Sequence, residues 1–234
     1  AGVRGEAARA LGRIGDTRAI PSLIEVLKDR DPFVVCHAAR ALGRLDACRA
    51  VRELTGLLTA GDVNVREAAA EALGRVKHYG AVKPLIGALK DGSPRVRCQA
   101  AQTLGELRGE ESPAILPLLK ALKDESAAVR ACANVALRNL APDARGVMVR
   151  LLKDEHTDVA IRRLAAEALG GMDDASSRRF LAEGLKSGAL EERVFAAYAL
   201  REIRDATAVL PLTRVLENDK RAVAVLASET LGKI

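Results

Sequence analysis

A leucine recurs along this chain at an almost constant interval, inside an Ala-Leu-Gly string or a close variant of it. The leucines are Leu11, Leu42, Leu73, Leu104, Leu137, Leu169, Leu200 and Leu231, and successive members lie 31, 31, 31, 33, 32, 31 and 31 residues apart. A fixed period of this length is typical of stacked repeats, in which each unit packs only against its neighbours. We therefore expect an elongated array that offers an extended surface and few deep pockets.

Each repeat carries two helical patterns. In residues 16–45, apolar positions between 20 and 27 follow the spacing of one helix face, and alanines and leucines between 34 and 45 form a second face. Asp31 and Pro32 lie between the two patterns and are typical of an N-cap and the first residue of a helix. The sequence predicts an all-α, right-handed α-α superhelix of about eight 31-residue repeats and about fifteen helices. We expect residues 1–234 to be a single solenoid, or a fragment of a longer array.

Composition limits what this array can contain. Apolar residues make up 49% of the chain, but aromatic residues only 2%, so the core must consist of aliphatic side chains. The sequence contains no run of about 18 apolar residues, so we expect no membrane-spanning helix. The cysteines (Cys36, Cys48, Cys98 and Cys132) and the three histidines have no metal-ligand spacing. We expect reduced cysteines, no metal, no cofactor and a cytoplasmic protein.

Two further positions recur with the repeat. A glycine follows most of the repeat leucines, which indicates a helix cap or a close approach of helices. An arginine precedes the leucine by seven residues in six repeats: Arg4, Arg66, Arg97, Arg130, Arg162 and Arg193. We expect these arginines to bind turn carbonyls or the turn aspartates Asp29, Asp62, Asp91, Asp124 and Asp154. Because the position recurs from layer to layer, stacking explains it better than ligand binding.

Segments within the repeats carry a family resemblance. VREAAAEALGRV, ALGRIGDTRAIPSLIEVLKD and AVKPLIGALKDGSPRVR resemble the short HEAT-like repeats of the phycobilisome-lyase type. The resemblance covers essentially the whole chain. It implies a right-handed superhelix of antiparallel helix pairs with the second helix of each pair on the concave side. It is specific for the fold rather than for function, because this repeat serves many unrelated roles.

Three classes of function compete. A non-catalytic scaffold or adaptor that binds a protein partner through the concave face is the interpretation we favour. Among enzymes, a di-iron centre like that of deoxyhypusine hydroxylases is excluded, because the sequence contains no His-Glu dipeptide. A bilin lyase-like subunit stays an alternative, although three Phe and two Tyr are few to line a pigment pocket. Nucleic-acid binding is a further alternative, limited to phosphate contacts because Tyr79 and Tyr198 lie far apart and Trp is absent.

Exposed positions of the second helices suggest the binding site. The residues two before and two after the repeat leucine are i, i+4 neighbours, and in the N-terminal repeats most of them are basic. The candidate partner-binding residues are Arg9, Arg13, Arg40, Arg44 and Arg75. They favour an acidic partner, whereas farther along the chain the same positions are neutral or acidic. The alternative is that these arginines belong to an ordinary solvent-exposed helix face and bind no partner.

The two ends of the array are expected to be unusually apolar. The candidate apolar interface near the C-terminal end consists of Val194, Phe195, Tyr198, Val225 and Leu226. Exposed apolar patches commonly mark interfaces. We therefore expect end-to-end self-association, a covering partner, or continuation of the array. The alternative is that local twisting buries these side chains within the chain itself.

Overall fold

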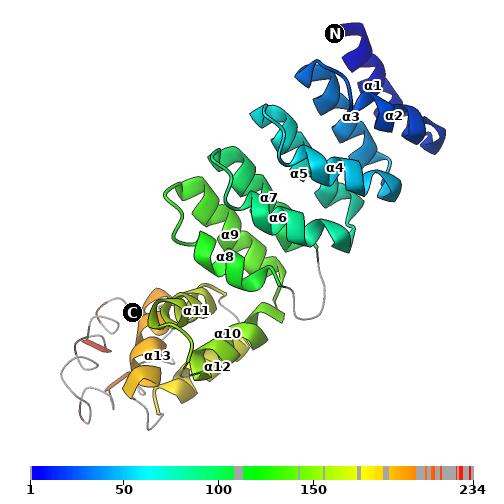
Figure 1. The fold of residues 1–234 in the computed structure, drawn as a ribbon. Coiled ribbons are helices and arrows are strands. Elements are labelled where there is room, and N and C mark those ends of the chain that lie inside the picture. Colours follow the sequence, from blue (N-terminus) through cyan, green and yellow to red (C-terminus); the bar gives the residue numbers. More distant parts are fainter. Residues whose placement is uncertain are drawn as a thin grey trace. The chain divides into compact units, whose positions relative to one another are not determined.

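A computed structural model describes the backbone of residues 2–107, 113–141, 143–154, 156–172, 175–186 and 190–203, together with Val209, Leu212, Thr213, Glu217, Val225, Ala227, Ser228 and Gly232. In this part of the chain every regular element is helical, so the all-α solenoid is confirmed (Figure 1). No helix of the described part is long and apolar enough to cross a membrane. The chain divides into two compact units, residues 1–140 and 141–234.

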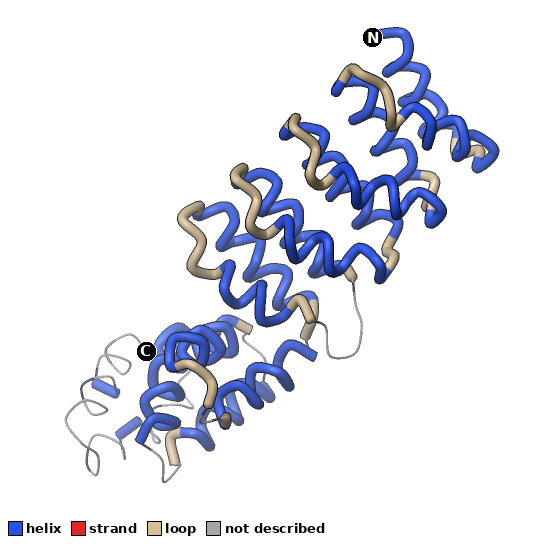
Figure 2. The backbone as a smooth tube through the Cα atoms, viewed as in Figure 1, coloured by secondary structure: helices blue, strands red, loops and turns tan. Residues whose placement is uncertain are grey.

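The first unit contains nine α-helices among its described residues. They are α1 (Gly2–Ile14), α2 (Ile20–Val26), α3 (Pro32–Arg44), α4 (Val51–Leu57), α5 (Val63–Val76), α6 (Val82–Ala88), α7 (Pro94–Glu106), α8 (Ile115–Ala121) and α9 (Ala127–Asn139). Short 3-10 turns at Thr17–Ala19, Cys48–Ala50 and Tyr79–Ala81 precede α2, α4 and α6. Each short even-numbered helix packs against the longer helix that follows it. The longer helices form a second row, with α1, α3, α5, α7 and α9 side by side (Figures 1 and 2).

Local sequence fixes where the long helices begin. Asp31 precedes α3 in an extended conformation, and its carboxylate accepts a hydrogen bond from the backbone N–H of Phe33. Pro32 is the first residue of α3, where the missing N–H costs no hydrogen bond. Asp62 caps α5 in the same way, through the N–H groups of Asn64 and Val65. The predicted N-cap and first helical residue of α3 are thus confirmed.

The repeated glycine lets neighbouring long helices approach each other closely. A Cβ atom built on Gly105 would lie 2.6 Å from the Cα of Ala136, and one on Gly12 would lie 2.7 Å from the Cα of Ala41. Both glycines lie inside helices, so close packing rather than capping explains them. The repeat leucines Leu42, Leu73 and Leu104 are completely buried in the same row. The core consists of aliphatic side chains, as the composition predicts.

The second unit contains four α-helices among its described residues: α10 (Asp143–Lys153), α11 (Val159–Gly171), α12 (Ala175–Gly184) and α13 (Leu190–Ile203). Helices α10 and α12 each contact α11, and α11 and α12 pack against α13. A Cβ atom on Gly170 would lie 2.4 Å from the carbonyl oxygen of Ala199, so the close approach recurs between α11 and α13. The remaining helices expected from the period fall largely outside the described residues.

Candidate functional site

Recurring arginines tie the long helices α5 and α7 to two turns each. Arg97 on α7 donates from Nε and Nη2 to the carboxylate of Asp124, at 2.8 Å each. Its Nη1 donates to the carbonyl oxygens of Asp91 and Gly92, in the turn that precedes its own helix. Arg66 on α5 repeats the arrangement, and we call the series the arginine ladder. The predicted contacts with turn carbonyls or aspartates are confirmed for Arg4, Arg66, Arg97 and Arg130, and they give these four arginines a structural role.

Electrostatics within the ladder favours the charged forms. Hydrogen bonding from Arg97 lowers the pKa of Asp124 below its usual value, against the opposing effect of burial. Burial raises the pKa of Asp91, but hydrogen bonds from Arg66 and from the backbone of Ser93 bring it below its ordinary value. The side chains of Arg97 and Asp124 are only 8% and 12% exposed, so this ion pair is well shielded from water.

One position of the ladder differs from the prediction. Asp62 was expected to pair with an arginine, but its carboxylate caps α5 instead. Counting from the repeat leucine, Ala60 holds the position of Asp91, while Val35 holds that of Arg66. Val35 is 5% exposed and Ala60 is half-buried, so an apolar pair occupies the place of the ion pair.

The five candidate binding arginines lie on α1, α3 and α5, in the row of long helices. Arg13, Arg44 and Arg75 occupy the last turns of their helices, where cations interact favourably with the helix dipole. Arg9 and Arg40 lie one turn earlier on α1 and α3. Since α1 packs on α3 and α3 on α5, the structure brings all five onto successive helices.

Ion pairs divide these arginines into two groups. Arg40 donates to Glu71 on the next long helix at 3.0 Å, and Arg75 reaches the same carboxylate at 3.3 Å. Arg9 pairs with Glu6 on its own helix. Sequence reasoning missed these partners, although Glu71 stands at the position of Arg40 one repeat later. Among the described residues, Arg13 and Arg44 make no ion pair and are exposed to solvent.

A histidine reports the electrostatic potential at this surface. Burial lowers the pKa of His37 on α3, and the positive charge of Arg40 adds to this effect. Glu6 acts in the opposite direction, whereas Arg9 and Arg44 lower the pKa further. Three arginines and one glutamate therefore act on the same imidazole. The surface of α1 and α3 around His37 is positively charged.

The candidate apolar interface requires a correction. Phe195 was expected to be exposed, but it is 6% exposed and lies under Arg162, whose guanidinium carbon is 5.4 Å from the ring centroid. Its ring also lines a cavity of about 210 Å³ in the second unit. Val194 is half-buried, and Val225 is 50% exposed. The side chain of Tyr198 and all of Leu226 lie outside the described residues.

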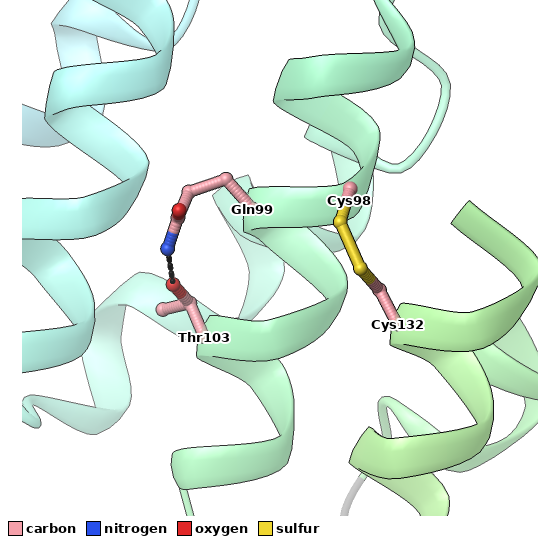
Figure 3. The surroundings of a disulfide bond; sticks show 4 residues. All are labelled: Cys98, Gln99, Thr103 and Cys132. Carbon is pink, nitrogen blue, oxygen red and sulfur yellow. Dashed lines mark hydrogen bonds between the residues drawn. A yellow bond between two sulfur atoms is a disulfide. The ribbon is translucent and has the colours of Figure 1, made fainter. Parts of the chain in front are cut away.

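Two cysteines also differ from the prediction. Cys98 on α7 and Cys132 on α9 form a disulfide, with their Cα atoms 5.5 Å apart (Figure 3). The expectation that all four cysteines are reduced is therefore wrong for this pair. Cys36 and Cys48 are free thiols, the first buried and the second exposed. In the described part of the chain, no three His, Cys, Asp or Glu side chains are grouped so that they could hold a metal ion.

Sequence comparison identifies the repeat type. The family model described as HEAT repeats matches residues 1–63, 51–116 and 115–197. The model described as PBS lyase HEAT-like repeat matches residues 192–218. None of the curated proteins compared with the chain matches it.

The chain is similar to several solved structures. One is the complex of CpcE and CpcF of phycocyanin lyase from Nostoc sp. PCC7120, at 24% identity and a TM-score of 0.54, covering 100% of this chain and 90% of that one. Two engineered proteins are 22% and 25% identical, each with a TM-score of 0.45. The alignments cover 92% and 98% of this chain, and 95% and 74% of the engineered ones. At these identities the likeness to the Nostoc complex concerns the fold alone.

Proposed function

We propose that this chain, which belongs to the HEAT repeat family, is a non-catalytic scaffold that binds an acidic segment of a protein partner along its row of long helices. The observation that carries the proposal is the pair Arg13 and Arg44, exposed on neighbouring helices without ion pairs among the described residues. An incoming carboxylate can bind either guanidinium without first displacing an internal partner. Arg9, Arg40 and Arg75 add positive charge to the surface, but each already pairs with Glu6 or Glu71, so a ligand carboxylate must compete with that partner.

The described surface supports a binding role better than a chemical one. The arginines are supported by rigid helices and lie in the open, where long-range attraction accelerates association with an acidic partner. The same exposure gives a reaction little protection from water. We therefore retain the scaffold as the first candidate, with no cofactor as part of the proposal. A cytoplasmic location is not part of it, because that expectation rested on four reduced cysteines and Cys98 and Cys132 form a disulfide, a bond that is rare in the cytosol.

A bilin lyase-like subunit is the second candidate. It is favoured by the match of the PBS lyase HEAT-like model to residues 192–218. Incubating the full chain with a linear tetrapyrrole and following its absorbance tests this role. A shifted absorbance band that saturates with the protein concentration supports the lyase-type candidate, and an unchanged spectrum removes it.

The scaffold proposal is tested with two double variants of equal charge. Arg13→Glu/Arg44→Glu changes the proposed site, whereas Arg49→Glu/Arg52→Glu changes two exposed arginines on the row of short helices. The probe is a fluorescein-labelled, glutamate-rich peptide, and binding is followed by anisotropy. We expect the first variant to weaken binding by about tenfold or more and the second by less than about twofold. Equal losses in both variants would contradict a site and indicate a response to net charge alone.

The same assay separates protein from nucleic acid as the partner. A single-stranded oligonucleotide replaces the peptide, and salt is varied. If phosphate contacts govern binding, the logarithm of the affinity falls linearly with the logarithm of the salt concentration, with a slope of about −0.7 for each phosphate that the protein neutralises. The scaffold proposal predicts that the peptide binds more tightly than the oligonucleotide at about 0.15 M salt. The reverse order would favour nucleic acid.

A further inference from the structure

A furrow crosses the C-terminal ends of the long helices in the first unit. It consists of two hollows of about 580 Å³ each. One is lined by the ends of α3 and α5 and by α7, and the other by the ends of α5, α7 and α9. Lys77 and Glu106 line both hollows, so the two adjoin. The glycines Gly43, Gly74 and Gly105 contribute to the lining, and their missing side chains help to hollow the surface.

The two ends of the furrow differ in chemistry. The α3 end holds Arg44 together with Arg75, in the continuation of the basic surface described above. The α9 end is lined by Tyr79 and Asn139, and the side chain of Tyr79 is well exposed at 57%. Val135 lies one helical turn before Asn139 on the same face of α9 and is 53% exposed. An exposed tyrosine and an exposed valine offer apolar contact area beside an amide.

The middle of the furrow is electrically balanced. Lys77 and Glu106 carry opposite charges, and Glu71 is already bound to Arg40 and Arg75. Asp46 faces the same hollow as Arg44, so a ligand acidic along its whole length would meet carboxylates there. The charges therefore favour a ligand whose acidic part stays near Arg13 and Arg44 and whose remaining part is uncharged.

The dimensions fit an extended peptide. Neighbouring helices pack about 8–10 Å apart, so the three steps of the furrow from α3 to α9, together with one more step to Arg13 on α1, span roughly 32–40 Å. A peptide in the polyproline II conformation rises about 3.1 Å per residue and places every third side chain on the same side, which gives about 10–13 residues for this span. One step between neighbouring helices corresponds to about three residues of the peptide.

We propose that the furrow and the adjoining basic surface of α1 bind one extended protein segment of two parts. Its acidic residues, about three positions apart, lie over Arg13 and Arg44, and an apolar or aromatic residue lies over Tyr79 and Val135. This inference rests on the proposed function, because it uses the same arginines for the acidic part. It adds the apolar contacts at the α9 end of the furrow and the spacing between the acidic part and the apolar part of the bound segment.

Two labelled peptides of about twelve residues test the inference with the full chain. Both carry two glutamates three positions apart at one end. The two-part peptide ends in Leu and Phe, and the acidic control peptide has Ser at these two positions. We expect the two-part peptide to bind about tenfold more tightly, because it buries apolar area that the control lacks.

Variants then assign this gain to the furrow. Tyr79→Ser/Val135→Ser should remove the advantage of the two-part peptide and leave the affinity for the acidic peptide within about twofold. Val159→Ser, at a similarly exposed valine of the second unit, should preserve the advantage. Melting curves of the variants check that the fold is retained. Equal affinities of the two peptides for the unchanged protein, or an advantage that survives in Tyr79→Ser/Val135→Ser, would overturn the inference. Failure of both peptides to bind would instead overturn the proposed function.

Discussion

Val35 and Ala60 occupy the two positions at which neighbouring repeats place an arginine and the aspartate that it binds. In the repeats on either side, Arg4 pairs with Asp29 and Arg66 with Asp91, each across 25 residues, which is also the separation of Val35 and Ala60. Both partners of one ion pair are thus replaced together by apolar residues. This is the expected behaviour of a contact pair, since removing one partner alone would leave a buried charge or a buried carboxylate unpaired.

The missing ion pair can be restored as a test of the ladder. Val35→Arg alone should destabilise the protein because the new charge has no carboxylate, and Ala60→Asp alone should have a small effect. The free energy of unfolding of the double variant should be about 1–3 kcal/mol higher than the sum of the two single effects predicts. Chemical denaturation of the four proteins measures this coupling. Strict additivity would show that the ladder contacts contribute nothing specific to stacking.

Two glycines in helices should respond oppositely to the same substitution. Gly56→Ala on α4 meets no atom within 4 Å and should stabilise the protein by about 0.5–1 kcal/mol, because alanine favours the helix. Gly105→Ala places its Cβ 2.6 Å from the backbone of Ala136 and should destabilise by about 1–3 kcal/mol. Thermal melting compares the two variants. Stabilisation by both would mean that the long helices can move apart without cost.

The ladder predicts loss of stability in acid. The folded pKa of Asp124 lies below its unfolded value, so the unfolded chain binds a proton more readily. The stabilisation of the fold by the ionised Asp124 carboxylate is fully present above about pH 4 and is lost as the pH falls through the folded pKa of Asp124. Asp124→Asn should therefore be less stable than the unchanged protein at pH 7, with a difference that shrinks below about pH 4. A difference that is constant from pH 7 to strong acid would contradict this role.

The disulfide predicts a response to reduction. It closes a loop of 34 residues, so its removal should cost about 3–4 kcal/mol through the entropy of the unfolded chain. Denaturation with and without reductant measures the loss, and Cys98→Ser should be insensitive to the reductant. Thiol titration of the oxidised, denatured protein should find only Cys36 and Cys48. Four free thiols before reduction would show that the bond does not form.

Sequence periodicity predicted most of the fold and part of the site. The period located the long helices, and the recurring Arg97 predicted its contacts with Asp124 and the turn carbonyls. In the turns before α3, α5, α7 and α9 the cap and ladder positions lie only two residues apart, which is why Asp62 was assigned to the ladder. The disulfide had no motif, but Cys98 and Cys132 are offset by one position between consecutive repeats, a spacing that places them on facing sides of α7 and α9.

For the candidate binding arginines, the sequence pattern predicted the position on the helix but not the contacts between helices. Sequence spacing placed Arg40 on the surface of a long helix, and the structure agrees. Its pairing with Glu71 depends on contact between equivalent positions of successive helices, which a single-helix pattern does not describe. Phe195 was misjudged because hydrophobic periodicity along α13 does not indicate that Arg162 on α11 covers the ring.

The central claim is that an acidic segment binds the surface formed by α1 and α3, and the imidazole of His37 reports on it directly. The chain has three histidines, so NMR can follow His37 through a pH titration with and without the glutamate-rich peptide. Burial lowers the pKa of His37 in the free protein and the neighbouring arginines lower it further, so bound carboxylates should raise it. The Arg13→Glu/Arg44→Glu variant should lose this response to the peptide. Saturating peptide that leaves the pKa of His37 unchanged would contradict the account.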